Sequence, residues 1–162
     1  MERDGNRRGA RVAEPFWRSG SAEVFRHGYT YSAHPTACAV GLSNLDLIER
    51  EQLIGRVIEL EPVLAGKLRP LADHDLVSEV RAGTGLLAVA EIAQDARTRE
   101  PGIGPRLVAE IRDRGVITRL VRGEALQVSP PFVVTEQEIE RVAETFAAAF
   151  DAVAGAEPPP GS

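Results

Sequence analysis

The stretch His27–Pro35 holds more usable chemistry than any other part of this 162-residue chain, because two of the three histidines lie there beside tyrosines and aliphatic hydroxyls. Pro35 suits the first position of a helix, where a missing N–H group is no loss. Thr30 and Ser32 then lie just ahead of a helix N-terminus, whose free backbone N–H groups favour an anion. The stretch therefore predicts a binding site for a phosphate or a carboxylate.

Two basic side chains elsewhere are further candidates for chemistry. Arg119 is a charged residue inside the otherwise apolar run 116–121, so it must face either solvent or an anion. Both a surface ion pair and a carboxylate-binding role stay open for it. Lys67 is the single lysine among 19 basic residues, so any lysine-dependent chemistry in this chain must use it. Its position on a helical segment predicts a solvated side chain.

A metal site is the third possibility. Cys38, the single cysteine, follows His34 by one helical turn, so the two side chains would share a helix face. A structural zinc site needs four ligands, and His27 and His74 add no second pair at a recognisable spacing. We therefore expect no metal site, and we expect Cys38 to be a small buried residue in an apolar stripe.

The composition indicates a globular protein of one or two domains, with 43% hydrophobic and 27% charged residues. The formal net charge of −5 argues against a nucleic-acid partner, which would need a concentrated basic face. No run approaches the roughly 18 apolar residues of a membrane helix, and the N-terminal residues do not resemble a signal peptide. We therefore expect a cytoplasmic protein with neither a nucleic-acid nor a membrane partner.

Hydrophobic spacing predicts the elements that carry these residues. Thr135 and Glu138 form a capping box at the start of the last helix, where each side chain accepts from the other residue's backbone N–H. The expected helices are 36–50, 52–69 with a bend at Pro62, 106–114 and the segment after Thr135; the expected strands are 76–80, 86–92, 116–121 and 125–129, with a glycine-bearing break at 81–85 and a loop at 93–104.

This order of elements predicts an α/β to α+β fold, in which two long helices precede a short, mainly antiparallel sheet covered by helices. Residues 14–17 should form a short helical turn. Four regions are expected: a flexible leader at 1–11, a helical segment at 12–70, a small α+β domain at 71–154 and a disordered tail at 155–162.

Four blocks of the sequence resemble successive blocks of the class III, or ω-type, aminotransferases, which are fold-type-I pyridoxal-phosphate enzymes. The blocks are Arg11–Trp17, Phe25–Pro35, Asn44–Glu51 and Leu126–Phe132, and the similarity runs from about Arg11 to Val153. The resemblance implies the C-terminal portion of such an enzyme. Residues 12–70 would then be a partial large-domain segment with an interdomain helix, and 71–154 the small domain.

The resemblance also implies roles for particular residues. Thr30 would donate a hydrogen bond to the phosphate of pyridoxal 5′-phosphate bound by the neighbouring subunit, and Tyr29 would line the substrate pocket. Arg119 would bind the substrate carboxylate, for which a planar guanidinium group is suited. Because the alignment across 119–123 needs a one-residue shift, Arg122 is an alternative. The substrates implied are a small amine or amino acid and a keto acid or aldehyde.

The family's Schiff-base lysine lies upstream of the Arg11–Trp17 block, so the resemblance implies that this chain contains no catalytic lysine. Without it the cofactor lacks its covalent anchor and the proton transfer lacks its base. We therefore expect a chain that is inactive alone and acts as a homodimer or with an upstream lysine-bearing half. The apolar faces of 36–50 and Trp17 should then be exposed and promote self-association. A non-catalytic α+β interaction or regulatory module is the alternative.

Overall fold

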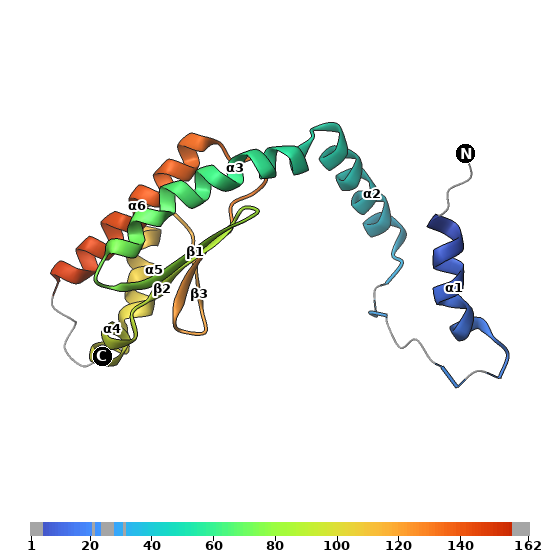
Figure 1. The fold of residues 1–162 in the computed structure, drawn as a ribbon, viewed down its shortest axis with the longest axis horizontal. Coiled ribbons are helices and arrows are strands. Elements are labelled where there is room, and N and C mark those ends of the chain that lie inside the picture. Colours follow the sequence, from blue (N-terminus) through green and yellow to red (C-terminus); the bar gives the residue numbers. More distant parts are fainter. Residues whose placement is uncertain (1–4, 21, 24–27, 31, 157–162) are drawn as a thin grey trace. The chain divides into compact units, whose positions relative to one another are not determined.

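The computed structural model describes residues 5–20, 22–23, 28–30 and 32–156, and it divides into two compact units at Asn44 and Leu45. The first unit holds α1 (Gly5–Trp17) and the start of α2 (Pro35–Arg50). The second holds α3 (Leu53–Leu68), the 3₁₀ turn η1 (Arg69–Asp73), β1 (Val77–Thr84), β2 (Leu87–Ile92), α4 (Gln94–Arg99), α5 (Ile103–Asp113), β3 (Arg119–Val121), β4 (Ala125–Val128) and α6 (Glu136–Gly155) (Figure 1). No helix within the described ranges is both long and apolar enough to cross a membrane.

The second unit is built on one antiparallel sheet with the strand order β1-β2-β4-β3. A tight turn joins β3 to β4, and two of its residues have positive φ angles, 54° at Arg122 and 77° at Gly123. Such turns match the twist of a hairpin. The predicted break at 81–85 lies at the end of β1, where the register shifts between Ala82 and Thr84. The expected fold class, a short antiparallel sheet covered by helices, is confirmed.

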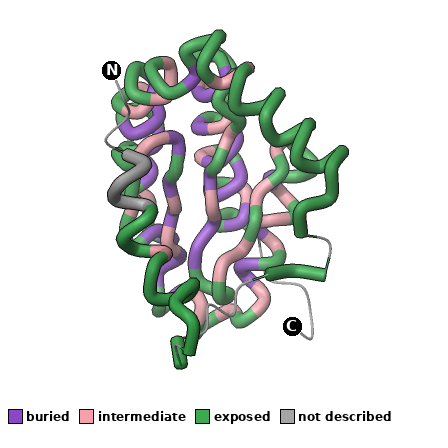
Figure 2. Tube along the Cα trace, turned by 90° about the vertical axis from the view of Figure 1, so that its right-hand side faces the viewer, coloured by how far each residue is buried: buried purple, intermediate pink, exposed green. Residues whose placement is uncertain are grey.

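The core lies between one face of this sheet and the helices α3, α5 and α6. Alternate residues of β2 point to opposite faces, so Ala88 and Ile92 are buried while Leu87 is 55% exposed. In Figure 2 the buried segments gather along the strands and the helix sides that face them. The helices contribute Leu60, Leu64, Leu68, Leu107, Ile111, Ile139, Phe146 and Phe150 to this core.

The expected domain boundary at residue 70 differs from the division in the structure. Helix α3 precedes that boundary, yet its residues Leu60, Leu64 and Leu68 are part of the core of the second unit. The spacing of these leucines gives α3 one apolar side, which packs on β1 and α6. The helix continues through Pro62, so residues 53–68 form a single helix, and this helix packs into the core of the small domain.

Two segments expected to be irregular are helical. Residues 5–11, where a flexible leader was expected, form the first part of α1, which begins at Gly5. An ion pair between side chains one helical turn apart, Glu14 and Arg18 at 3.1 Å, stabilises the C-terminal end of this helix. The loop predicted at 93–104 contains α4, whose Ala96 is buried in the core. Burial against the rest of the domain stabilises these few residues as a helix, which local spacing alone does not reveal.

Residue 155, the first residue of the predicted tail, is the last residue of α6. Residues 157–162 lie outside the described residues, as do residues 1–4.

The predicted capping box is present at the start of α6. Glu138 N–H donates to Thr135 Oγ1 at 3.2 Å, and Thr135 N–H donates to Glu138 Oε2 at 2.8 Å. The bond from the Thr135 backbone, together with the one from its hydroxyl, lowers the pKa of Glu138 below 4.5. This interaction therefore stabilises the fold fully above that value, and its contribution disappears as the pH falls through the lowered pKa.

Replacing Thr135 with alanine should reduce the free energy of unfolding by about 1 kcal/mol near neutral pH, because an N-cap hydroxyl is lost. Glu138→Gln should destabilise the chain less at acid pH than at neutral pH, since the wild-type carboxylate loses its own contribution there. Urea unfolding at the two pH values measures both effects. Glu59→Gln, on the exposed side of α3, is the matched control. An equal loss for Glu138→Gln at both pH values would contradict the proposed linkage.

Candidate functional site

The predicted anion-binding stretch forms a tight turn directly before α2. Tyr29 N–H donates to Ser32 Oγ at 2.7 Å, and Ser32 N–H donates back to the Tyr29 carbonyl at 2.9 Å. Thr30 lies inside this turn and is exposed. Helix α2 begins at Pro35, as the sequence predicts. Two other residues of the stretch, His27 and Tyr31, lie outside the described residues.

The hydroxyl and imidazole side chains of this turn differ in whether they already have a partner within it. His34 Nδ1 accepts the Ala37 N–H at 3.5 Å, and Ser32 Oγ is already bonded to Tyr29, so both side chains hold the turn itself. Among the described residues the Thr30 hydroxyl has no such internal partner. A hydroxyl donor ahead of a helix N-terminus fits one edge of a phosphate group. Thr30 is therefore the hydroxyl, among the described residues of this turn, that is free to contact an external anion.

The prediction that Cys38 is buried is wrong. Cys38 is exposed, and no residue of α2 is buried. Other apolar residues of the helix are exposed as well, 64% for Leu42 and 61% for Leu45, because no described segment covers this side. Trp17 of α1 is 85% exposed. The expectation that these apolar faces are uncovered is confirmed.

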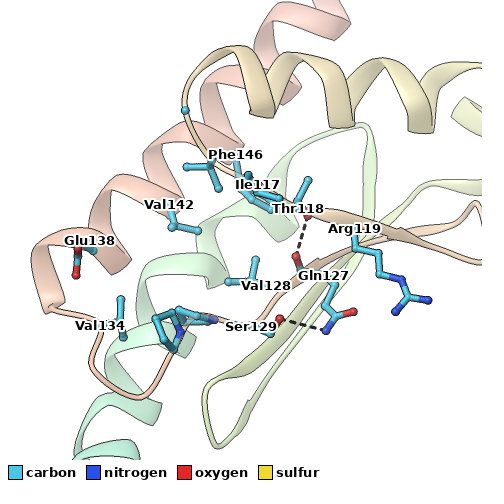
Figure 3. Close-up of a pocket in the computed structure, with 14 residues that line it drawn as sticks. Ile117, Thr118, Arg119, Gln127, Val128, Ser129, Val134, Glu138, Val142 and Phe146 are labelled. Carbon is cyan, nitrogen blue, oxygen red and sulfur yellow. Dashed lines mark hydrogen bonds between the residues drawn. The ribbon is translucent and has the colours of Figure 1, made fainter.

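A hollow of about 620 Å³ lies between the β3–β4 hairpin and α6 (Figure 3). Apolar side chains, including Val142 and Phe146, line most of the end near α6, where Glu138 of the same helix also lies. At the other, more polar end, Arg119 and Gln127 lie on neighbouring strands, and their side chains extend away from Val142 and Phe146. A largely apolar hollow with a few polar groups is typical of a small-molecule site.

Arg119 is the charged group of this polar end. It is the first residue of β3, it is exposed, and it opposes Gln127 across the hairpin. Within the described part of the chain its guanidinium group makes no ion pair. The rival Arg122 lies in the hairpin turn and does not line the hollow. Thr30 and Tyr29 share a turn of the first unit, whereas Arg119 belongs to the second.

Three polar residues of the hollow were missed by sequence reasoning. Thr118 Oγ1 donates to the Gln127 carbonyl at 2.8 Å, and Gln127 Nε2 donates to Ser129 Oγ at 3.2 Å. The available signal was the pair of expected strands 116–121 and 125–129, because their antiparallel register places residue 127 opposite residue 119. Among the described residues no cluster of three or more histidine, cysteine, aspartate or glutamate side chains is placed to hold a metal ion.

Lys67 is poorly suited to form an imine with a carbonyl group. Its amine donates a hydrogen bond to Glu140 of α6, and this bond raises the pKa of Lys67 above 10.5, with the charges of Glu140, Glu144 and Glu136 adding to the effect. An amine must be unprotonated to attack a carbonyl carbon, and active-site lysines usually have lowered pKa values. The surroundings of Lys67 raise its pKa instead of lowering it.

Comparison with known proteins identifies the family. Residues 9–150 match the family described as aminotransferase class-III. The aminotransferase YhxA of Bacillus subtilis, whose function is uncharacterized, is 35% identical over 151 residues, covering 88% of this chain and 33% of the relative. The putrescine–pyruvate aminotransferase of Pseudomonas aeruginosa is 37% identical over 123 residues, covering 73% of this chain and 26% of the relative.

Solved structures lead to the same family. An amine transaminase from an uncultivated Pseudomonas species, in a form with bound pyridoxal phosphate, superposes with a TM-score of 0.76 at 34% identity, covering 88% of this chain and 33% of that one. An aminotransferase of Bacillus anthracis gives a TM-score of 0.74 at 32% identity, covering 88% and 34%. The chain thus spans about a third or less of the length of these proteins. It belongs to the class III aminotransferase family.

Proposed function

We propose that this chain supplies the C-terminal portion of a pyridoxal-phosphate-dependent aminotransferase, which moves an amino group between an amine or amino acid and a keto acid or aldehyde. The observation that carries the proposal is Arg119, a guanidinium group without an ion-pair partner among the described residues, at the edge of a largely apolar hollow. This combination suits a substrate with a carboxylate and a short carbon chain.

Two further residues complete the proposed contribution of this chain. The Thr30 hydroxyl donates to the phosphate of a cofactor held by another subunit, and Tyr29, which is 77% exposed, lines the adjacent substrate space. When bound, pyridoxal phosphate supplies the electron sink that makes amino-group transfer possible. Arg119 orients the substrate through its carboxylate.

The proposed partner that supplies the catalytic lysine is an upstream, lysine-bearing half of the enzyme, and a second copy of the chain would complete a dimer without adding a new lysine. Lys67 is the single lysine of the chain, and its ion pair with Glu140 keeps the amine protonated. A lysine outside these 162 residues must therefore provide the covalent anchor and move the proton. The uncovered apolar side of α2 is the surface best suited to that partner.

The test combines this chain with the lysine-bearing part of a class III relative, with putrescine and pyruvate as substrates. Alanine should form in the mixture and not with this chain alone. After borohydride reduction, the pyridoxyl group should be found on the partner's lysine, and Lys67→Arg should leave the mixture active. Turnover by this chain alone, with the pyridoxyl group on Lys67, would overturn the proposal.

A different outcome would favour the alternative of a non-catalytic α+β interaction or regulatory module. That alternative expects a folded chain which neither binds pyridoxal phosphate nor co-purifies with the lysine-bearing part. Co-purification and cofactor absorbance therefore separate the two functions before any turnover is measured.

A further inference from the structure

The sheet face opposite the helical core carries a row of four side chains, one from each strand. The register pairs Arg81 with Val89, Val89 with Gln127, and Gln127 with Arg119. Directly opposed residues on neighbouring antiparallel strands have Cβ atoms about 4.5–5.5 Å apart and share a face of the sheet. The flanking Leu126 and Val128 of β4 are buried in the core, which places Gln127 on the open face. Gln127 is therefore the immediate cross-strand neighbour of Arg119.

The two arginines of this row have different surroundings. The Arg81 guanidinium pairs with Glu91 at 2.6 Å and also with Glu79, and these two hydrogen bonds raise its pKa. Arg119 has no comparable acidic partner among the residues that the structure describes. Of the two, Arg119 is the one whose charge remains available for an external anion.

The Gln127 side chain is held in place beside this charge. Its Nε2 donates to Ser129 Oγ at 3.2 Å, and its backbone carbonyl accepts the Thr118 hydroxyl at 2.8 Å. A carboxamide nitrogen carries two N–H groups, so one remains after the bond to Ser129. Figure 3 shows Gln127 and Arg119 at the same end of the hollow, away from Phe146.

We propose that Gln127 is a second carboxylate-binding residue, which donates its remaining Nε2–H to one carboxylate oxygen while Arg119 binds the other. This inference rests on the proposed function, because it takes the substrate carboxylate to be the ligand of Arg119. A neutral donor suits this position, since it adds a directed hydrogen bond without cancelling the guanidinium charge. A glutamate in its place would pair with Arg119 and compete with the substrate.

The test titrates the full chain with propionate and follows the side-chain NMR signals of Arg119 Nε–H and Gln127 Nε2–H₂. Both signals should shift along the same binding curve, and neutral propionamide should shift neither. Gln127→Met, which keeps the side-chain length, should weaken propionate binding at Arg119 by about 3- to 10-fold, the value of one lost hydrogen bond. The control, Gln94→Met on the exposed start of α4, should leave binding unchanged. Gln127→Glu should abolish binding and provides a second variant if the methionine variant does not fold.

The outcomes separate this inference from the function on which it rests. If Arg119 responds to propionate but Gln127 does not, or if Gln127→Met binds propionate as tightly as the wild type, the role of Gln127 is refuted and that of Arg119 survives. If neither signal responds, the carboxylate role is refuted for both residues. The transfer assay with the lysine-bearing part then shows independently whether the chain still belongs to an active enzyme.

Discussion

Replacing Arg119 with leucine should lower kcat/KM for a carboxylate-bearing amino donor by about 10- to 100-fold in the reconstituted enzyme, the value of a lost charge-assisted hydrogen-bond pair. The same change should leave kcat/KM for an uncharged amine nearly unaltered, because that substrate has no group for the guanidinium to bind. The ratio of the two values is the measurement. It cancels any loss of folded enzyme, which would reduce both activities equally.

The control for this prediction is the second arginine of the hairpin. Arg122 has a φ angle of 54°, a conformation that asparagine tolerates better than leucine, so Arg122→Asn is the appropriate variant. It should leave the substrate preference unchanged, since Arg122 does not line the hollow. If Arg122→Asn lowers the carboxylate preference and Arg119→Leu does not, the two residues exchange roles.

The elements that could be predicted from the sequence are those with strong local signals. Helix α6 combines an apolar stripe with the Thr135 and Glu138 capping box, and both its start and its type were predicted correctly. The β3–β4 hairpin was recognisable from two apolar runs around 122–124. Short helix α4 was missed because its stability depends on the burial of Ala96 against the rest of the domain. Such tertiary contacts produce no hydrophobic periodicity that can be recognised in a helix of only six residues.

In the candidate site, too, features with a local sequence signal were predicted, and features that depend on tertiary contacts were not. The position of Thr30 just ahead of a helix N-terminus was predicted, because Pro35 is a local signal for the start of α2. The neighbour of Arg119 was not predicted, because Gln127 comes beside it through strand pairing and not through sequence spacing. The burial of Cys38 was predicted wrongly for a related reason. An apolar stripe shows which side of a helix needs a partner, but it does not show whether these residues provide one.

Helix α3 has one side in the core of the second unit and one side exposed to solvent. Leu64 is 1% exposed in the core between α3, α6 and the sheet, whereas Ile58 of the same helix is 66% exposed. Leu64→Ala should therefore reduce the free energy of unfolding of the second unit by about 2–5 kcal/mol, because it removes buried methyl groups and leaves a cavity. Ile58→Ala, on the exposed side, should change it by less than about 0.5 kcal/mol.

Urea unfolding followed by circular dichroism measures both variants, and the gain in helix propensity from alanine is small in each. A large difference between them would mean that α3 folds with the sheet. A shortened chain beginning at residue 71 would then expose the apolar side of β1 and α6 that Leu64 and Leu68 cover. Equal, small effects would instead support the boundary near residue 70 that the sequence predicted, with α3 acting only as a connection between the two units.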